Sequence, residues 1–238
     1  CVTQKVIANA EKFGHELSDD MVEPIEGLDD VRAISQGPGT SCVVRASGEL
    51  WCWGIMSRKV ESKPIRVGSR SDWQHVAMSD LGGCAVRTDG QVYCWLPTEP
   101  FKSRSPNDAA ALNVVTTSPN QLIMGRGFAC APTTSGWQCW GSFANGQRGP
   151  NITDTAPLPA PDGAAWTMMT AGNQHVCGIK EGRTYCWGDN QFGQLGNGSD
   201  DHSGKTPAAL DTQVTFRAIS SAAFHACGIT NEDDLYCW

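Results

Sequence analysis

A pair of cysteines recurs five times along this 238-residue chain, and tryptophan directly follows the second cysteine of each pair. Within a pair the two cysteines are nine or ten residues apart, and successive pairs begin 42 to 50 residues apart. A fixed period of this length indicates one supersecondary unit stacked on copies of itself. The pairs are Cys42 and Cys52, Cys84 and Cys94, Cys130 and Cys139, Cys177 and Cys186, and Cys227 and Cys237.

Each pair fits the two strands of an antiparallel hairpin. If Cys42 faces Cys52, the loop is 46–48, and Gly48 supplies the positive φ that a three-residue hairpin loop needs. Opposed residues of such a hairpin lie within disulfide reach, so we expect one disulfide in each hairpin. The spacing is longer than the Cys-x2-4-Cys pattern of zinc sites. Pro132 would lie inside a strand of the third copy, which predicts a locally broken ladder there.

The segments around the hairpins predict an all-β propeller. A short β-rich run precedes most hairpins, and a variable stretch with Gly, Pro and Asn follows, which leaves room for a fourth strand. Four-stranded sheets at this period are typical of propeller blades. The hairpin strands are apolar on both faces, as expected for a sheet packed between two neighbours. We divide the chain into residues 1–30, the outer part of a blade begun upstream or closing the last blade, then repeat 1 at 31–71, repeat 2 at 72–113, repeat 3 at 114–164, repeat 4 at 165–214, and an incomplete repeat 5 at 215–238.

Cys1 has the same phase as the second cysteine of each pair, and it has no partner in the repeats. In one interpretation the five repeats are part of a larger propeller, and the partner of Cys1 lies upstream. In the other, residues 2–30 complete the blade that residues 216–238 begin. We favour the first interpretation, because it accounts for the odd cysteine, and we expect Cys1 to be unpaired within this segment.

The fourth copy is the most informative, and residues 171–196 read AGNQHVCGIKEGRTYCWGDNQFGQLG. This segment resembles the regulator of chromosome condensation repeat, and the resemblance implies a β-propeller, usually of seven blades. The version with paired cysteines is similar to secreted bacterial repeat proteins and to the crinkly-type ectodomains of plant receptor-like kinases. Across these relatives the shared role is the presentation of loops to a protein partner.

The composition of the chain limits the cellular compartment and the classes of binding partner that we expect. The formal net charge is −7 and no run of Lys or Arg occurs, which argues against nucleic acid and against the chromatin-binding activity of the founding family member. No apolar stretch has the length of a membrane span, so we expect no direct membrane insertion. Disulfides indicate an oxidising compartment, and we predict an extracellular protein, secreted or at the cell surface. Asn151 and Asn197 begin sequons and are candidate N-glycosylation sites.

No constellation of residues predicts catalysis, a cofactor or a metal. His175 and His225 each lie two residues before a first cysteine, and we interpret them as structural imidazoles that bond a backbone carbonyl. The acidic clusters read as solvated turns rather than as the facing carboxylates of a glycosidase. Most tryptophans repeat with the hairpins and are assigned to packing between blades. The candidate contact residues are the loop aromatics Phe101, Phe143 and Phe192.

The leading hypothesis is a non-enzymatic, extracellular propeller that binds or scaffolds protein, with a protein partner or a larger assembly expected. A lectin-like propeller that binds carbohydrate through loops on one face is the first alternative. A ligand-sensing receptor ectodomain is the second.

Overall fold

The computed structural model describes residues 24–56, 59–95, 110–141, 158–159, 166–199 and 201–238. These residues form five antiparallel sheets, each built from strands that are consecutive in the sequence. The only helical element among them is a 3-10 turn, η3 (Pro119–Gln121). The prediction of an all-β propeller with four-stranded blades is confirmed, and we number the sheets blade 1 to blade 5 along the chain.

The first four blades each contain four strands, and blade 5 contains three. Blade 1 comprises β1 (Val31–Gln36), β2 (Thr40–Arg45), β3 (Leu50–Met56) and β4 (Lys59–Arg66). Blade 2 comprises β5 (Trp73–Met78), β6 (Gly83–Arg87), β7 (Gln91–Trp95) and β8 (Ala110–Val115). Blade 3 comprises β9 (Ile123–Gly125), β10 (Phe128–Thr133), β11 (Gly136–Gly141) and β12 (Leu158–Pro159). Blade 4 comprises β13 (Trp166–Ala171), β14 (His175–Lys180), β15 (Arg183–Asp189) and β16 (Ser203–Ala209), and blade 5 comprises β17 (Phe216–Ser221), β18 (Ala226–Thr230) and β19 (Leu235–Cys237).

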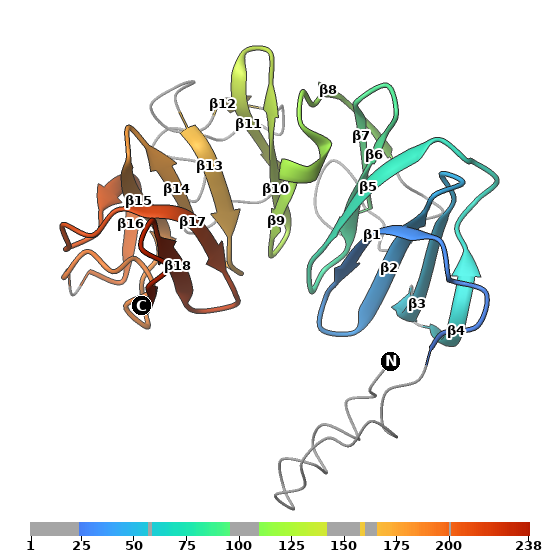
Figure 1. Cartoon of the computed structure of the whole chain (residues 1–238), viewed down its shortest axis with the longest axis horizontal. Coiled ribbons are helices and arrows are strands. Elements are labelled where there is room, and N and C mark those ends of the chain that lie inside the picture. The colour runs from blue at the N-terminus through green and yellow to red at the C-terminus, as the bar shows by residue number, and fades with distance from the viewer. Residues whose placement is uncertain (1–23, 57–58, 96–109, 142–157, 160–165, 200) are drawn as a thin grey trace, which may run out of the picture.

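The blades follow one another along an arc, from blade 1 at one end to blade 5 at the other (Figure 1). The first strands of consecutive blades contact each other, in the order β1, β5, β9, β13 and β17. Hydrogen bonds tie these strands together: Met78 N donates to Ser35 Oγ over 2.9 Å, and Ser221 N donates to Thr170 Oγ1 over 2.9 Å. The first strands therefore run along the inner side of the arc.

Each cysteine pair is joined by a disulfide within its hairpin, with Cα atoms 4.0 to 4.1 Å apart. The cysteines face each other in the register that the sequence predicts. Gly48 and Gly90 close two of the hairpin loops with φ near +81°. The blade 5 loop contains no glycine, and Asp233 takes the left-handed conformation in its place, with φ of 68°.

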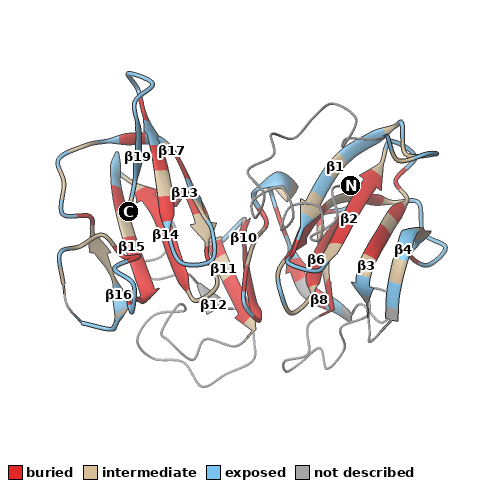
Figure 2. Ribbon diagram, turned by 90° about the horizontal axis from the view of Figure 1, so that it is seen from below, coloured by how far each residue is buried: buried red, intermediate tan, exposed pale blue. Residues whose placement is uncertain are grey.

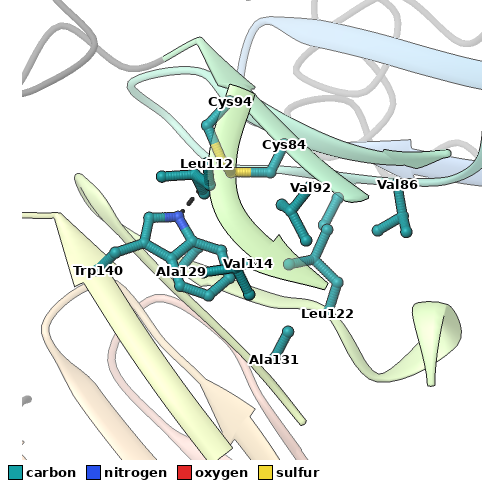
Figure 3. Packing of buried hydrophobic residues seen from close by; sticks show 11 residues of the cluster. Cys84, Val86, Val92, Cys94, Leu112, Val114, Leu122, Ala129, Ala131 and Trp140 are labelled. Atoms are coloured by element: carbon teal, nitrogen blue, oxygen red, sulfur yellow. Dashed lines mark hydrogen bonds between the residues drawn. A yellow bond between two sulfur atoms is a disulfide. The ribbon is translucent and has the colours of Figure 1, made fainter. Parts of the chain in front are cut away.

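The two side chains of each Cys-Trp dipeptide lie on opposite faces of the blade, because successive side chains on a strand point to opposite faces. In blade 2 the disulfide of Cys84 and Cys94 packs against Trp140 and Ala129 of blade 3 (Figure 3). Trp140 is fully buried, and its Nε1 donates to Cys94 Sγ over 3.3 Å. The other three interfaces repeat this arrangement. Each blade thus presents its disulfide to the next blade and its tryptophan to the previous one.

Burial falls from the middle of each blade outwards. The middle strands, such as β2, β14 and β15, are largely buried, whereas the outer strands β4 and β16 are exposed along much of their length (Figure 2). This pattern agrees with a core that lies between the blades rather than at the outer edge of the arc.

The expected break at Pro132 is wrong. The ladder between β10 and β11 runs without a shift from Phe128 to Thr133, and Pro132 faces Trp137. Strand β9 pairs with β10 only as far as Cys130, so the missing N–H of Pro132 lies beyond the end of that neighbour. Its carbonyl oxygen still accepts hydrogen bonds from Thr117 N and Thr116 Oγ1. Proline is tolerated at this place because no ladder bond is lost.

Candidate functional site

Two loops meet at one end of blades 4 and 5. In an up-and-down sheet, the turn between the first two strands and the loop between the last two strands emerge at the same end. At that end blade 4 contributes the β15–β16 loop, and blade 5 contributes the β17–β18 turn. We call the residues of these two segments, 190–199, 201–202 and 222–225, the rim.

A buried polar network holds the blade 4 part of the rim in place. The side chains of Asp189, Asn190 and Gln194 are buried. Gln194 Nε2 donates to Asp189 Oδ2 over 2.7 Å, and Asn190 Oδ1 accepts from Leu195 N over 3.0 Å. Gln194 Oε1 also accepts from Phe192 N over 2.8 Å. Satisfied networks of this kind rigidify a segment, so the loop is organised before any partner arrives.

The rim carries an exposed aromatic pair. The ring centroids of Phe192 and Phe224 are 5.1 Å apart, with an angle of 61° between the planes. Phe192 is 68% exposed and Phe224 is 47% exposed. The β13–β14 turn of blade 4 supports the blade 5 part of the rim, because Asn173 N donates to Ala223 O over 3.1 Å. A large apolar surface therefore projects into solvent from a rigid base.

His175 lies beneath this end of the interface between blades 4 and 5, and the expected bond to a carbonyl is wrong. The side chain is fully buried, and neither Nδ1 nor Nε2 has a hydrogen-bond partner in the described structure. Burial, and to a smaller extent the nearby His225, lower the pKa of His175 from 6.5 to about 4. The ring is thus held neutral, while His225 is exposed.

The predicted contact residues are only partly brought together. Phe192 lies at the centre of the rim, whereas Phe101 and Phe143 lie outside the described residues. Asn197 lies in the rim loop and is half-buried, and its Oδ1 accepts from Ser199 N over 3.1 Å. Cys1 and Asn151 also lie outside the described residues. Sequence reasoning missed Phe224, although its place before His225 aligns it with the turn that precedes His175.

Two general features of the described residues bear on the chemistry. No three His, Cys, Asp or Glu side chains among them gather into a group that could hold a metal ion. The same part of the chain contains no helix long and apolar enough to cross a membrane.

Family models for the regulator of chromosome condensation (RCC1) repeat match residues 181–229 and 31–58. These segments cover the second hairpin of blade 4 with most of blade 5, and the first three strands of blade 1. The chain is an RCC1-repeat β-propeller. The first match includes the β15–β16 loop that carries Phe192.

Two curated relatives of this RCC1-repeat propeller come from Arabidopsis thaliana. The RCC1 domain-containing protein RUG3, mitochondrial, is 26% identical over 242 residues, which cover 87% of this chain and 53% of RUG3. The ultraviolet-B receptor UVR8 is 30% identical over 104 residues, which cover 42% of this chain and 23% of UVR8. The chain therefore spans about half the length of RUG3 and less of UVR8.

Solved structures share the fold at low sequence identity. Human WBSCR16 superposes with a TM-score of 0.73 at 19% identity, over 91% of this chain and 61% of that one. Yeast RCC1 (Prp20), solved bound to Kap60, gives 0.71 at 19% identity, over 86% of this chain and 54% of that one. The crinkly ectodomain of the Arabidopsis thaliana receptor kinase ACR4 gives 0.51 at 18% identity, over 86% of this chain and 63% of that one.

Proposed function

We propose that this chain is a non-enzymatic propeller module that binds a protein partner through the rim of blades 4 and 5. The observation that carries the proposal is the exposed pair Phe192 and Phe224, set on loops of two adjacent blades. Exposed aromatic side chains on loops that a rigid scaffold positions are the usual anchors of protein interfaces. Yeast RCC1, which has the same fold, was solved in complex with a protein, and this supports the class of partner.

The proposal includes an extracellular location, secreted or at the cell surface. Five disulfides within 238 residues favour an oxidising compartment, because cytosolic thiols are kept reduced. The fold shared with the ACR4 ectodomain is consistent with this location. Glycosidase treatment of the protein from its native source tests it, because a glycan on Asn197 would appear as a mass shift. A protein recovered from mitochondria or cytosol with free thiols would contradict it.

The proposal also keeps the division into repeats at 31–71, 72–113, 114–164, 165–214 and 215–238. In this division repeats 4 and 5 together form the binding unit, and repeats 1 to 3 support it. Partner contacts should therefore fall on the last two repeats.

Site-specific cross-linking tests the rim directly. A photo-reactive phenylalanine analogue replaces Phe192 in one variant and Asp89 in a matched variant, since Asp89 is exposed in the β6–β7 turn of blade 2, at the opposite end of the blades. We expect a partner protein to cross-link from position 192 and not from position 89. The purified partner should then bind the unmodified chain saturably and lose about tenfold or more in affinity to Phe192→Ala, as for an interface anchor. Equal cross-linking from both positions, or unchanged affinity in Phe192→Ala, would contradict the proposal.

A further inference from the structure

A second site lies at the inner side of the arc, at the end of the blades opposite the rim. A cavity of about 640 Å³ opens between blades 3, 4 and 5. Its volume falls within the range of ligand sites in proteins. Its walls come from η3 and β9 of blade 3, from β13 and the end of β14 of blade 4, and from β17 of blade 5.

The cavity follows the free edge of β13. Four consecutive residues of this strand, 167–170, line it. Consecutive side chains point to opposite faces of a sheet, so a strand lines a cavity in this way only along its edge. Met169 packs toward blade 3 and Met168 toward blade 5, which places the cavity across both faces. Among the described residues, strand β13 is the terminal strand of its sheet and pairs only with β14. Its inner edge is therefore available for pairing with another strand.

A bulge shapes this edge. The register between β13 and β14 shifts between Trp166 and Met168, so Thr167 is the extra residue. Its Oγ1 donates to Ile179 O over 3.1 Å. Bulges occur where a strand re-aims a side chain or ends its pairing, and they are frequent beside binding sites. Blades 1, 2 and 5 have the same bulge, with Arg32, Gln74 and Arg217 as the extra residues.

The side chains around the cavity favour a peptide over a sugar or a nucleic acid. Neutral hydrogen-bonding groups (Asn120, Gln121, Thr167, Thr170 and Ser220) lie beside Ile, Met and Phe side chains. Among the described lining residues the single aromatic ring belongs to Phe216, which is buried and packs against Trp238, so no exposed ring is offered to a sugar. The described part of the lining contains one charged side chain, Arg217, which is too little positive charge for a nucleic acid.

Arg217 adds a preference for a carboxylate. Its Nε donates to Thr230 O over 2.9 Å, which fixes the direction of the guanidinium. Its Nη2 pairs with Asp233, whose side chain is largely exposed. An exposed pair of this kind contributes little stability, so a ligand carboxylate can take the place of Asp233. A guanidinium can bind a carboxylate through two parallel hydrogen bonds, which makes the pair strong and specific in geometry.

We propose that this cavity, the axial groove, binds an extended segment of a protein that carries an acidic residue. The segment adds a strand to the inner edge of β13, and its carboxylate pairs with Arg217. Main-chain hydrogen bonds give the affinity in this mode, and the side-chain contacts give the specificity. The axial groove lies at the other end of the blades from the rim, and it does not depend on the rim.

A random dodecapeptide phage library, selected against the full chain, supplies the probe. Enriched peptides are synthesised, and their affinities are measured by fluorescence anisotropy for the unmodified chain and for two pairs of variants. Arg217→Gln removes the charge in the groove, and Arg32→Gln makes the same change at the equivalent bulge of blade 1. Thr167→Glu fills and charges the groove, and Gln74→Glu is its match in blade 2. Thermal melting of each variant confirms that it is folded.

We expect acidic peptides whose affinity falls at least about tenfold in Arg217→Gln and Thr167→Glu and changes less than about twofold in the matched controls. Hydrogen exchange of the β13 amides should slow when the peptide binds, as strand addition requires. The proposal is overturned if no peptide is enriched, or if the enriched peptides bind all variants equally. It is also overturned if the β13 amides exchange at an unchanged rate. Peptides whose affinity falls only in a Phe192→Ala variant bind at the rim, and this result would overturn the proposal for the axial groove.

Discussion

At the scale of single residues, His175 makes the interface between blades 4 and 5 sensitive to acid. The folded protein holds this ring neutral, with a pKa of about 4, while in the unfolded chain it titrates near 6.5. Below pH 6.5 the unfolded state therefore binds the additional proton. Stability is complete above that pH and is lost progressively as the pH falls toward 4, by up to about 3 kcal/mol.

The variant His175→Phe removes this titration, and the chain itself shows that phenylalanine fits. Phe128 occupies the equivalent position in blade 3 and is fully buried. We expect denaturation at about pH 7.5 and about pH 5 to show that the unmodified chain loses about 2 kcal/mol more than His175→Phe over this interval. His202→Phe, changed at an exposed histidine that does not contribute to the pKa shift of His175, is the control and should behave like the unmodified chain. An identical pH dependence of all three proteins would contradict this account.

At the scale of the strand, blade 5 differs from the other blades in the cover over its disulfide. In blades 1 to 4 both cysteines are fully buried beneath the next blade. In blade 5 Cys237 is exposed and Cys227 is half-buried, because among the described residues no further blade covers this face and β19 has no fourth strand beside it. Thiolate attack on a disulfide depends on access, so this bridge should react first. Mild reduction followed by alkylation and mass spectrometry should label Cys227 and Cys237 before the cysteines of the other four disulfides. Earlier labelling of Cys42 and Cys52 would contradict the burial pattern.

The register of these elements could be predicted from the sequence, whereas the outer strands and the binding surfaces could not. The cysteine spacing and a loop glycine such as Gly48 constrain a hairpin locally, so the positions of the two middle strands of each blade could be predicted. The fourth strands lie at variable distances beyond loops, and no local pattern defines them. Phe192 could be predicted as a contact residue because it is an aromatic residue in a loop. Phe224 and the axial groove could not be predicted, because both arise when segments far apart in the sequence pack together.

At the scale of the whole molecule, the two ends of the arc expose the faces that the internal blades bury. On blade 1 the side that would face a preceding blade exposes Ile34 by 68%, whereas its equivalent in blade 2, Val76, is fully buried. On blade 5 the side that would face a following blade exposes Leu235 by 67% and Ile229 by 36%. Ile179, the equivalent of Ile229 in blade 4, is buried. One end thus presents a tryptophan face and the other a disulfide face, and the four internal interfaces show that these faces are complementary.

We therefore predict that this segment associates head to tail when its concentration rises, with blade 1 of one copy against blade 5 of another. Such a contact uses two different surfaces, and it can close into a ring or extend. Sedimentation velocity over a concentration series should show association that Ile34→Lys and Leu235→Lys each weaken by about tenfold or more, since burying an unpaired charge costs several kcal/mol. Val115→Lys changes an exposed apolar side chain of the internal blade 2 and should leave association unchanged. A segment that stays monomeric at every concentration, or that responds to Val115→Lys as strongly as to the other two changes, would show that the end faces do not bind each other. Further repeats in the same polypeptide would compete for both faces, so extending the segment by one blade at either end should suppress the association.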